Sequence, residues 1–309
     1  MADSNSKGRR LKDLIEAPDI LISPGLFDGY SARLVESRGF KSGAISGAGL
    51  SECHLGYPDR GLMGFEENLS NCRAIADCCD LLLHADADTG YGNAVNVYFV
   101  TQAFEKAGMA AVMFEDQTWP KRCGHMVGKS VIEAEEMVEK IHAACDAKKD
   151  PDFIIKARTD SRGPLGLDEA IKRLNMYAEA GADLLFADAL LSEEDISTVA
   201  ANVDKPLTVN MGLGIRARTT TPLVPPKRLE EMGVAAVELT AAWLSAWMPT
   251  AMVRAAMALA AAWWPCLPCM PACGRARAAA ARCPSCRGAL LLAGGAGRPV
   301  HLLARPVAQ

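Results

Sequence analysis

The sequence predicts an α/β protein built as an eight-stranded (β/α)8 barrel. One observation is a recurring phrase, as in YAEAGADLLFAD and LEEMGVAAVEL, in which a helical stretch ends at glycine and a short apolar run follows. The other is the count, because eight such units fit into roughly 250 residues, the usual size of this barrel. A doubly wound open sheet is the alternative, but no G-x-G-x-x-G follows the first strand, so we favour the barrel.

Each repeat predicts one strand and one helix. Glycine ends a helix readily because it adopts the left-handed conformation without strain, and an apolar run of about five residues fits a strand covered on both faces. The predicted strands are 20–23, 42–46, 81–86, 110–115, 153–158, 183–187, 206–210 and 234–239. The predicted helices are 29–38, 66–78, 94–107, 132–147, 167–180, 192–202, 226–232 and 240–262.

Composition is that of a globular protein with a sizeable core. Half of the 309 residues are hydrophobic, 23% are charged and the net charge is −4, which argues against a nucleic-acid-binding face. The first residues lack the apolar region of a secretory signal. The most apolar later stretch is interrupted by Pro249 and Arg254, so we expect no membrane span and a cytoplasmic protein.

The composition changes at about residue 262. We therefore expect a catalytic barrel over 1–261 and an Ala-, Arg-, Cys- and Pro-rich tail over 262–309 that is disordered or atypical. Two Cys-x2-Cys pairs in this tail imitate a four-cysteine zinc module, but a run of alanines lies between them where such modules have turns and strands. The four cysteines are Cys266, Cys269, Cys283 and Cys286.

Polar residues follow the predicted strands, where a barrel of this kind carries its chemistry. In chain order they are Ser46, Gly47, Asp86, Asp88, Glu115, Asp116, Arg158, Asp160, Asp188 and Asn210.

Four of the acids, including one in the loop after the second strand, could converge and would then repel one another. Oxygen ligands without His or Cys indicate Mg²⁺ or Mn²⁺, and the alternative is a set of helix caps and solvated loop acids. The four are Asp59, Asp86, Asp88 and Glu115.

Two further features indicate an anionic ligand. Arg158 lies on an otherwise apolar strand, where it either pairs with a barrel acid or holds a substrate carboxylate. Cys123 stands between Lys121-Arg122 and His125, and nearby cations favour the thiolate, so we expect a lowered pKa for this thiol. The cysteine is then a reactive group, or an accident of a basic loop.

With SGAG, LGYPD, DADTGYGN, EDQ, PKRCGH and ARTD in this order, residues 10 to 250 resemble the isocitrate lyase and phosphoenolpyruvate mutase superfamily. GYGNAVNV and KRCGHMVGK resemble its branch of 2,3-dimethylmalate lyase, petal death protein and carboxyphosphonoenolpyruvate phosphonomutase, near the 2-methylisocitrate lyases.

The resemblance implies Mg²⁺ held by Asp86 and, partly through water, by Asp59, Asp88 and Glu115. It implies that Ser46, Gly47 and Arg158 bind substrate carboxylates and that Phe27 and Asp28 line the pocket. KRCGH would be a gating loop that brings in Cys123 as acid or base, together with Lys121, Arg122 and His125. A homo-oligomer, a tetramer in this family, is also implied.

The chain departs from the family pattern at the mouth of the barrel. Asp188 stands where these lyases usually have glutamate, Leu213 replaces an acid, and the loop 211–221 is longer and more basic. These changes leave the metal site intact, and they concern Asp188, Asn210 and the distal end of the substrate.

The resulting expectation is a Mg²⁺-dependent retro-aldol carbon–carbon lyase acting on a small 2-hydroxy di- or tricarboxylate, such as a 2-alkylmalate or 2-methylisocitrate. Its products are a 2-oxo acid and a carboxylate. The alternatives on the same fold are a carboxyphosphonoenolpyruvate-type phosphonomutase and an oxaloacetate or phosphonopyruvate hydrolase or decarboxylase. A non-catalytic barrel with a binding role is a further alternative, suggested by Asp188, Leu213 and the tail.

Overall fold

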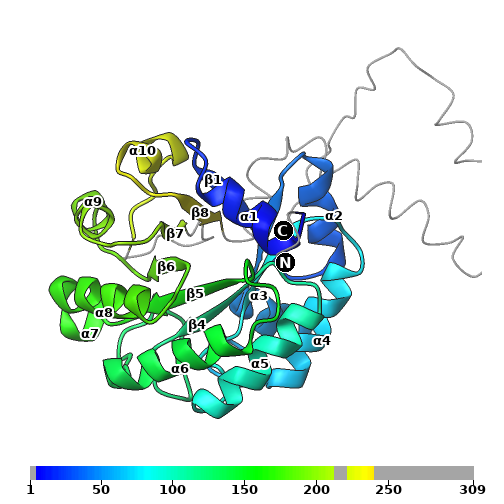
Figure 1. Cartoon of the computed structure of the whole chain (residues 1–309), viewed down its shortest axis with the longest axis horizontal. Helices are drawn as coiled ribbons and strands as arrows, with labels where there is room; N and C mark the ends of the chain where they lie inside the picture. Colours follow the sequence, from blue (N-terminus) through cyan, green and yellow to red (C-terminus); the bar gives the residue numbers. More distant parts are fainter. Residues whose placement is uncertain (1–4, 212–220, 240–309) are drawn as a thin grey trace, which may run out of the picture. The chain divides into compact units, whose positions relative to one another are not determined.

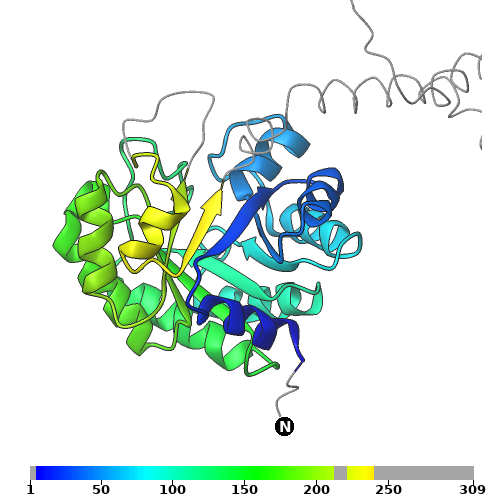
Figure 2. The same ribbon diagram turned by 90° about the horizontal axis from the view of Figure 1, so that it is seen from above.

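Eight parallel strands close into a barrel in the order in which they occur in the chain (Figures 1 and 2). The computed structural model describes residues 5–211 and 221–239. β1 closes the barrel by pairing with β8, with Leu21 opposite Ala236. The strands are β1 Leu21–Leu26, β2 Ser42–Ile45, β3 Leu82–Asp86, β4 Ala111–Glu115, β5 Ile154–Thr159, β6 Leu184–Ala187, β7 Leu207–Met211 and β8 Ala236–Leu239. The predicted (β/α)8 fold is confirmed.

Helices alternate with the strands around the barrel, as Figure 1 shows. The main helices are α2 Gly29–Ser37, α4 Phe65–Ala76, α5 Ala94–Lys106, α6 Ala134–Ala147, α8 Leu167–Glu179, α9 Glu193–Ala201 and α10 Pro226–Glu231. Seven predicted helices correspond to these within two residues at each end. The eighth, 240–262, lies outside the described residues, as does the tail with its cysteine pairs.

The largest strand error is at β1, which continues three residues past its predicted end. Pro24 and Gly25 look like a turn in the sequence, yet both lie in the strand, where Pro24 is opposite Leu239 and Gly25 opposite Ala44. Proline lacks an N–H, so it usually marks a strand edge. The barrel accommodates it between its first and last strands.

One helix, α1 Lys7–Ile15, is absent from the prediction. Ser6 caps it by accepting a hydrogen bond from the Arg9 N–H at 3.1 Å. Leu11 and Ile15 are buried against the amino-terminal ends of the strands, in a cluster with Leu21, Leu82, Ile154, Leu184 and Ala236. The helix therefore closes the bottom of the barrel.

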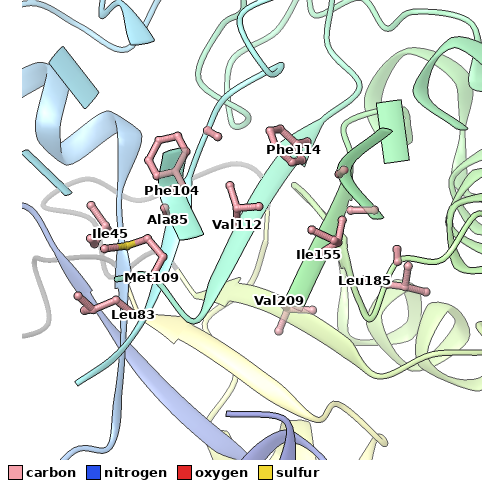
Figure 3. Packing of buried hydrophobic residues seen from close by; sticks show 14 of the residues in the cluster. Ile45, Leu83, Ala85, Phe104, Met109, Val112, Phe114, Ile155, Leu185 and Val209 are labelled. Atoms are coloured by element: carbon pink, nitrogen blue, oxygen red, sulfur yellow. The ribbon is translucent and has the colours of Figure 1, made fainter. Parts of the chain in front are cut away.

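The main core lies between the strands and the surrounding helices. Alternate strand residues point outward into it, among them Leu83, Ala85, Val112 and Phe114, and Figure 3 shows this layer with Phe104 of α5 beside them. Each fully buried Leu, Val or Phe side chain of this layer contributes about 2 kcal/mol to folding. The residues between them point into the barrel, so β3 turns His84 and Asp86 inward.

Three short helical turns follow the strands at the carboxyl end of the barrel. They are α3 Gly47–Leu50, the π-helical turn η1 Ser51–Leu55, and α7 Arg162–Leu165. Like the loops beside them, they bring polar groups to this end. No helix within the described residues is long and apolar enough to cross a membrane.

Candidate active site

A cavity opens at the carboxyl ends of the strands, and it brings together eight of the predicted site residues. These are Ser46, Asp59, Asp86, Cys123, His125, Arg158, Asp188 and Asn210. Asp88, Glu115 and Lys121 are buried and contact residues of this wall. The barrel therefore gathers at one site side chains that are up to 164 residues apart in the chain, from Ser46 to Asn210 (210 − 46).

Asp86 is held from both sides by backbone donors. The Gly47 N–H donates to Oδ2 at 3.3 Å and the Asp88 N–H donates to Oδ1 at 3.0 Å. A Cβ on Gly47 would lie 2.9 Å from Asp86 Oδ2, so glycine is required for this approach. The carboxylate at the end of β3 is thus fixed in position, as a ligand or catalytic group needs to be.

Asp88 and Asp59 share one cation, the ammonium of Lys121. Its Nζ lies 2.6 Å from Asp59 and 2.7 Å from Asp88. Burial alone would lower the pKa of Lys121, but the carboxylates of Asp88, Glu115, Asp59 and Asp86 outweigh it and hold this pKa well above its usual value. Burial raises the pKa of Asp88 to about 6 even with Lys121 beside it, and Asp86 and Asp59 add to this rise.

Glu115, at the end of β4, is a buried carboxylate without a hydrogen-bond partner among the described residues. Arg158 Nε lies 3.2 Å from its Oε2 as an ion pair. Burial holds the pKa of Glu115 well above its usual range, and the neighbouring Asp160 and Asp86 contribute to this. Such a carboxylate requires a cation, or it takes up a proton.

These carboxylates fit a hydrated divalent cation. The donors are all oxygens, Glu115 has unused ligand atoms, and the Lys121 ammonium already lies between two carboxylates, as a cation would. Over residues 5–211 and 221–239, no three His, Cys, Asp or Glu side chains are arranged to hold an ion directly. Magnesium commonly keeps several waters and takes only one or two carboxylates directly, so this arrangement suits it.

Arg158 of β5 is surrounded by acids. Its Nε and Nη2 donate to Asp160 at 2.8 and 3.0 Å, and Nη2 also donates to Asp188 at 3.0 Å. In this structure Arg158 therefore forms the ion pairs that were one of its two predicted roles. Because it also lines the cavity, its second role, holding a substrate carboxylate, stays a prediction.

The segment carrying KRCGH lies over the cavity. Gln117 holds its backbone, because the Arg122 N–H donates to Gln117 Oε1 at 3.1 Å and Gln117 Nε2 donates to the Arg122 carbonyl at 2.9 Å. The Cys123 N–H donates to the Asp59 carbonyl at 3.1 Å. Gly124 is buried against Asp188 and Arg158, the nearest side chains to it. The loop thus covers the mouth with Cys123 and His125 on the cavity wall.

The expected lowered pKa of Cys123 is wrong. Burial raises the pKa of this thiol, and the carboxylates of Asp59 and Asp188 raise it further, against the hydrogen bond from the His125 backbone and the charge of Arg158. Lys121, two residues before it in sequence, is turned to Asp59 and Asp88. A basic sequence around a cysteine does not make a basic surrounding in space, so the thiol carries its proton.

Among the predicted site residues outside the cavity lining, Phe27, Asp28 and Arg122 have their described contacts or exposure elsewhere. Asp28 caps α2, accepting from the Ser31 N–H at 2.7 Å, and Phe27 precedes it with its carbonyl accepting from His54 at 2.9 Å. The Arg122 side chain is exposed. Helix caps and loop cations have the same sequence appearance as ligand-binding groups, and only the direction of the side chain separates them.

The sequence did not indicate several polar residues that surround the predicted strand-end acids. Lys129 donates to Asp160 at 2.7 Å, and Asp116 accepts from Thr159, Tyr177 and Arg173. His84, Lys156 and Glu238 line the deep part of the cavity. Burial, together with the charge of Lys156, lowers the pKa of His84 to about 3. The signal for these three was present in the sequence, since each interrupts an apolar strand, as Arg158 does.

A family model described as phosphoenolpyruvate phosphomutase matches residues 11–260. The chain belongs to this family. It is 40% identical over 224 residues to 2,3-dimethylmalate lyase of Eubacterium barkeri, covering 72% of this chain and 76% of that one. It is also 42% identical over 204 residues to 2-methylisocitrate lyase of Aeropyrum pernix, covering 66% of this chain and 65% of that one.

Solved structures of the family agree with the fold. Oxaloacetate acetylhydrolase, in complex with the inhibitor 3,3-difluorooxalacetate, has a TM-score of 0.73 and 29% identity, over 95% of this chain and 99% of that one. Phosphonopyruvate hydrolase in complex with oxalate and Mg²⁺ has a TM-score of 0.67 and 27% identity, over 94% and 95%. Both of these structures contain a small carboxylate and the second also contains Mg²⁺. The chain is an enzyme of the carbon–carbon lyase type.

Proposed function

We propose that this enzyme is a Mg²⁺-dependent lyase that cleaves a small 2-hydroxy di- or tricarboxylate, such as a 2-alkylmalate, to a 2-oxo acid and a carboxylate. One observation carries the proposal: a protonated cysteine, Cys123, lines the same cavity as the fixed carboxylate Asp86 and the guanidinium Arg158. That set combines a cation site, an anion-binding group and a proton donor. The 40% identity of the chain to 2,3-dimethylmalate lyase supports the same reaction class.

Asp86 would hold the Mg²⁺ directly, with Asp59, Asp88 and Glu115 holding it partly through water. When bound, such an ion lowers the pKa of a coordinated hydroxyl and stabilises developing negative charge on oxygen. Ser46 and Arg158 line the cavity and would orient the carboxylate beside the hydroxyl. Two or more fixed contacts to one carboxylate hold the scissile bond in a reactive orientation.

Cleavage breaks the bond between the hydroxyl-bearing carbon and the carbon next to the second carboxylate. The hydroxyl gives its proton to a carboxylate of the site, one of Asp59, Asp88 or Glu115, and its oxygen becomes the carbonyl of the 2-oxo acid. The electron pair of the broken bond remains on the other carbon. The Cys123 Sγ–H then donates its proton to that carbon. A thiol kept neutral by burial and by Asp59 and Asp188 is suited to this role as a general acid.

The loop that carries Cys123 also excludes water. Gly124 lies against Asp188 and Arg158, and Lys121 anchors the loop to Asp59 and Asp88. A closed loop keeps the carbanion from being protonated at random and strengthens the charge interactions in the cavity. Closure and proton donation are thus performed by one segment.

Hydrolytic cleavage of oxaloacetate is a second candidate, because the oxaloacetate acetylhydrolase structure matches this chain with a TM-score of 0.73. It breaks the same kind of carbon–carbon bond but consumes water. The two reactions are distinguished by their products, because only the lyase reaction releases a new 2-oxo acid.

The test is incubation with Mg²⁺ and a panel of 2-alkylmalates, 2-methylisocitrate, oxaloacetate and phosphonopyruvate, followed by NMR. We expect equal amounts of a 2-oxo acid and a carboxylate from at least one 2-hydroxy acid, with loss of activity in EDTA. Turnover of oxaloacetate or phosphonopyruvate alone would overturn the lyase proposal in favour of hydrolysis or phosphonomutase chemistry.

A further inference from the structure

The cavity ends on a polar floor inside the barrel, below Asp86 and Arg158. Three side chains define this floor: His84 of β3, Lys156 of β5 and Glu238 of β8. Their exposed fractions are 3%, 1% and 14%. Buried ionisable groups are costly in a protein interior, and apolar residues of similar size would fill the space more cheaply. A polar floor on a substrate cavity therefore calls for an explanation in terms of the ligand.

Lys156 and Glu238 neutralise one another. The Lys156 Nζ donates to Glu238 Oε1, and the same ammonium lies 4.8 Å from the centre of the Phe186 ring. Arg158 also lies over that ring, at 5.3 Å, so Phe186 contacts both the cation of the floor and the cation of the mouth. The floor thus contains a cation whose charge Glu238 already balances, whereas the mouth carries Arg158, to which the proposed function assigns the substrate carboxylate.

The hydrogen bonds of His84 fix which of its atoms is available. Ser23 Oγ donates to Ser42 Oγ at 3.0 Å, and Ser42 in turn donates its single proton to the Leu82 carbonyl at 2.9 Å. Ser42 Oγ therefore accepts from His84 Nε2, 2.8 Å away. The other nitrogen, Nδ1, is a buried acceptor with no hydrogen-bond partner among the described residues, and it lies 3.8 Å from Glu238.

A second unsatisfied acceptor belongs to the same cavity. Asn210 Oδ1 is buried and, over the described part of the chain, has no hydrogen-bond partner. Asn210 lies opposite Glu238 in the β7–β8 register. The floor and its rim therefore present His84 Nδ1, Asn210 Oδ1 and the Glu238 carboxylate, all of which accept hydrogen bonds.

From this arrangement we infer that the floor is a specificity subsite for an uncharged, hydrogen-bond-donating arm of the substrate, such as a hydroxyl group, and that it rejects an additional carboxylate. This inference rests on the proposed function and narrows its substrate class from di- or tricarboxylates to dicarboxylates. A carboxylate entering the floor would lose its water beside Glu238, and it would leave the acceptors of His84 and Asn210 unpaired. A hydroxyl would donate to one of them and leave the Lys156–Glu238 pair intact.

Three ligands test the subsite: the first two have arms matched in size, and the third has a larger arm whose charge is separated from its size by the Glu238→Gln variant below. They are malates whose third carbon carries an ethyl, a hydroxymethyl or a carboxymethyl arm. Affinity is measured by calorimetry with Mg²⁺ present, in a Cys123→Ser background that slows turnover below the time of the measurement. We expect the hydroxymethyl ligand to bind tightest. The carboxymethyl ligand should bind at least tenfold more weakly than the ethyl ligand, because one repelled or unpaired charge costs about that factor in affinity. Equal or tighter binding of the carboxymethyl ligand would overturn the inference.

Glu238→Gln supplies the reciprocal test, because it leaves the Lys156 charge unbalanced. We expect it to reduce the penalty on the carboxymethyl ligand by about tenfold or more. A matched control is Asp195→Asn, which breaks a similarly buried ion pair with Arg162, 2.9 Å away, outside the cavity lining. The control should leave the ratio of the carboxymethyl affinity to the ethyl affinity unchanged. An unchanged ratio in Glu238→Gln as well would refute the role of Glu238.

If Glu238→Gln does not fold, the paired variant Lys156→Met with Glu238→Leu removes both charges together and keeps the volume. It should reduce the preference for hydroxymethyl over ethyl, and a preference as large as that of the native protein would contradict the inference. Binding is measured without turnover, so the two proposals fail separately. Cleavage without discrimination between the arms refutes the subsite, whereas discrimination without cleavage by the native enzyme refutes the lyase.

Discussion

Gly124 lies so close to Asp188 that a Cβ on it would be 1.5 Å from Asp188 Oδ2 and 2.5 Å from the Arg158 guanidinium. The loop that carries Cys123 can therefore reach the mouth of the barrel only because this position has no side chain. Asp188 is one methylene shorter than the glutamate the family usually has there. It pairs with Arg158 at 3.0 Å beneath the glycine.

Gly124→Ala should keep the loop from reaching this position. We expect kcat/KM to fall about 100-fold, since misplacing a catalytic group by about 1 Å has that effect. The stability of the barrel should change little, because the loop can move away from the mouth without altering the strands and helices. Steady-state kinetics and urea denaturation check the two parts. Full activity in the variant would show that the closed position is not needed.

Asp86→Asn should remove the response of the protein to Mg²⁺. Native protein with Mg²⁺ at about 100 times its Kd gains roughly 2.7 kcal/mol, which raises Tm by several degrees. The variant should show no rise, whereas Asp195→Asn should show the native one. A thermal denaturation series with and without Mg²⁺ measures this. An undiminished rise in Asp86→Asn would place the metal elsewhere.

Asp28→Ala tests whether this residue caps a helix or binds substrate. As a cap, accepting from the Ser31 N–H at 2.7 Å, it contributes about 1 kcal/mol to stability, which the alanine variant should lose. Asp28→Asn should retain most of that stability because asparagine caps equally well. KM should stay within twofold of native in both variants. A large rise in KM without loss of stability would restore the pocket role that the resemblance implies.

Asp160→Asn should lower stability in a pH-dependent way. Burial alone would raise the pKa of Asp160, but Arg158 and Lys129 outweigh it and hold this pKa well below its usual range. The ionised form is therefore favoured in the folded state, and its contribution is complete above the unfolded pKa of about 3.9. It is lost as the pH falls from there toward the folded pKa.

We therefore expect Asp160→Asn to cost about 3 kcal/mol at pH 7, as for a broken buried ion pair. The difference from native should shrink as the pH falls below about 4. Urea denaturation in EDTA at pH 7, 5 and 3.5 measures it. A difference that is constant over this range would show that Asp160 is not ionised in the folded protein.

The barrel was predictable from the chain because its strands are covered on both faces and so appear as apolar runs ended by glycine or acid. The helix α1 was not predictable, because its buried apolar residues Leu11 and Ile15 stand among many charged residues. Only the strand ends that they cover explain why these two side chains are apolar. The positions of Asp86 and Arg158 followed from the strand ends. The loop above them was not predictable, since Lys121 pairs with Asp59 and Asp88, and Gln117 holds the Arg122 backbone, along a path that no local pattern encodes.

The direction of the Cys123 pKa shift shows most clearly what the sequence alone does not determine. Sequence neighbours indicated a basic surrounding, yet Lys121 is turned to Asp59 and Asp88, and burial with Asp59 and Asp188 dominates around the thiol. Spatial neighbours decide a pKa, and they come from other strands. The floor residues His84, Lys156 and Glu238 each stand alone in an apolar strand, and the sequence does not show that the barrel brings them together.

The central claim is that Cys123 protonates the carbanion left by carbon–carbon cleavage, and comparing native enzyme with Cys123→Ser tests it most directly. With a 2-alkylmalate and Mg²⁺ in D2O, NMR follows the 2-oxo acid and the deuterium at the new C–H bond of the carboxylate product. We predict that the native enzyme places one deuterium in each molecule of the carboxylate product. Cys123→Ser should bind substrate with nearly native Kd but turn over 10²- to 10⁴-fold more slowly, the usual range for loss of a general acid. A rate in Cys123→Ser within tenfold of native would contradict the claim.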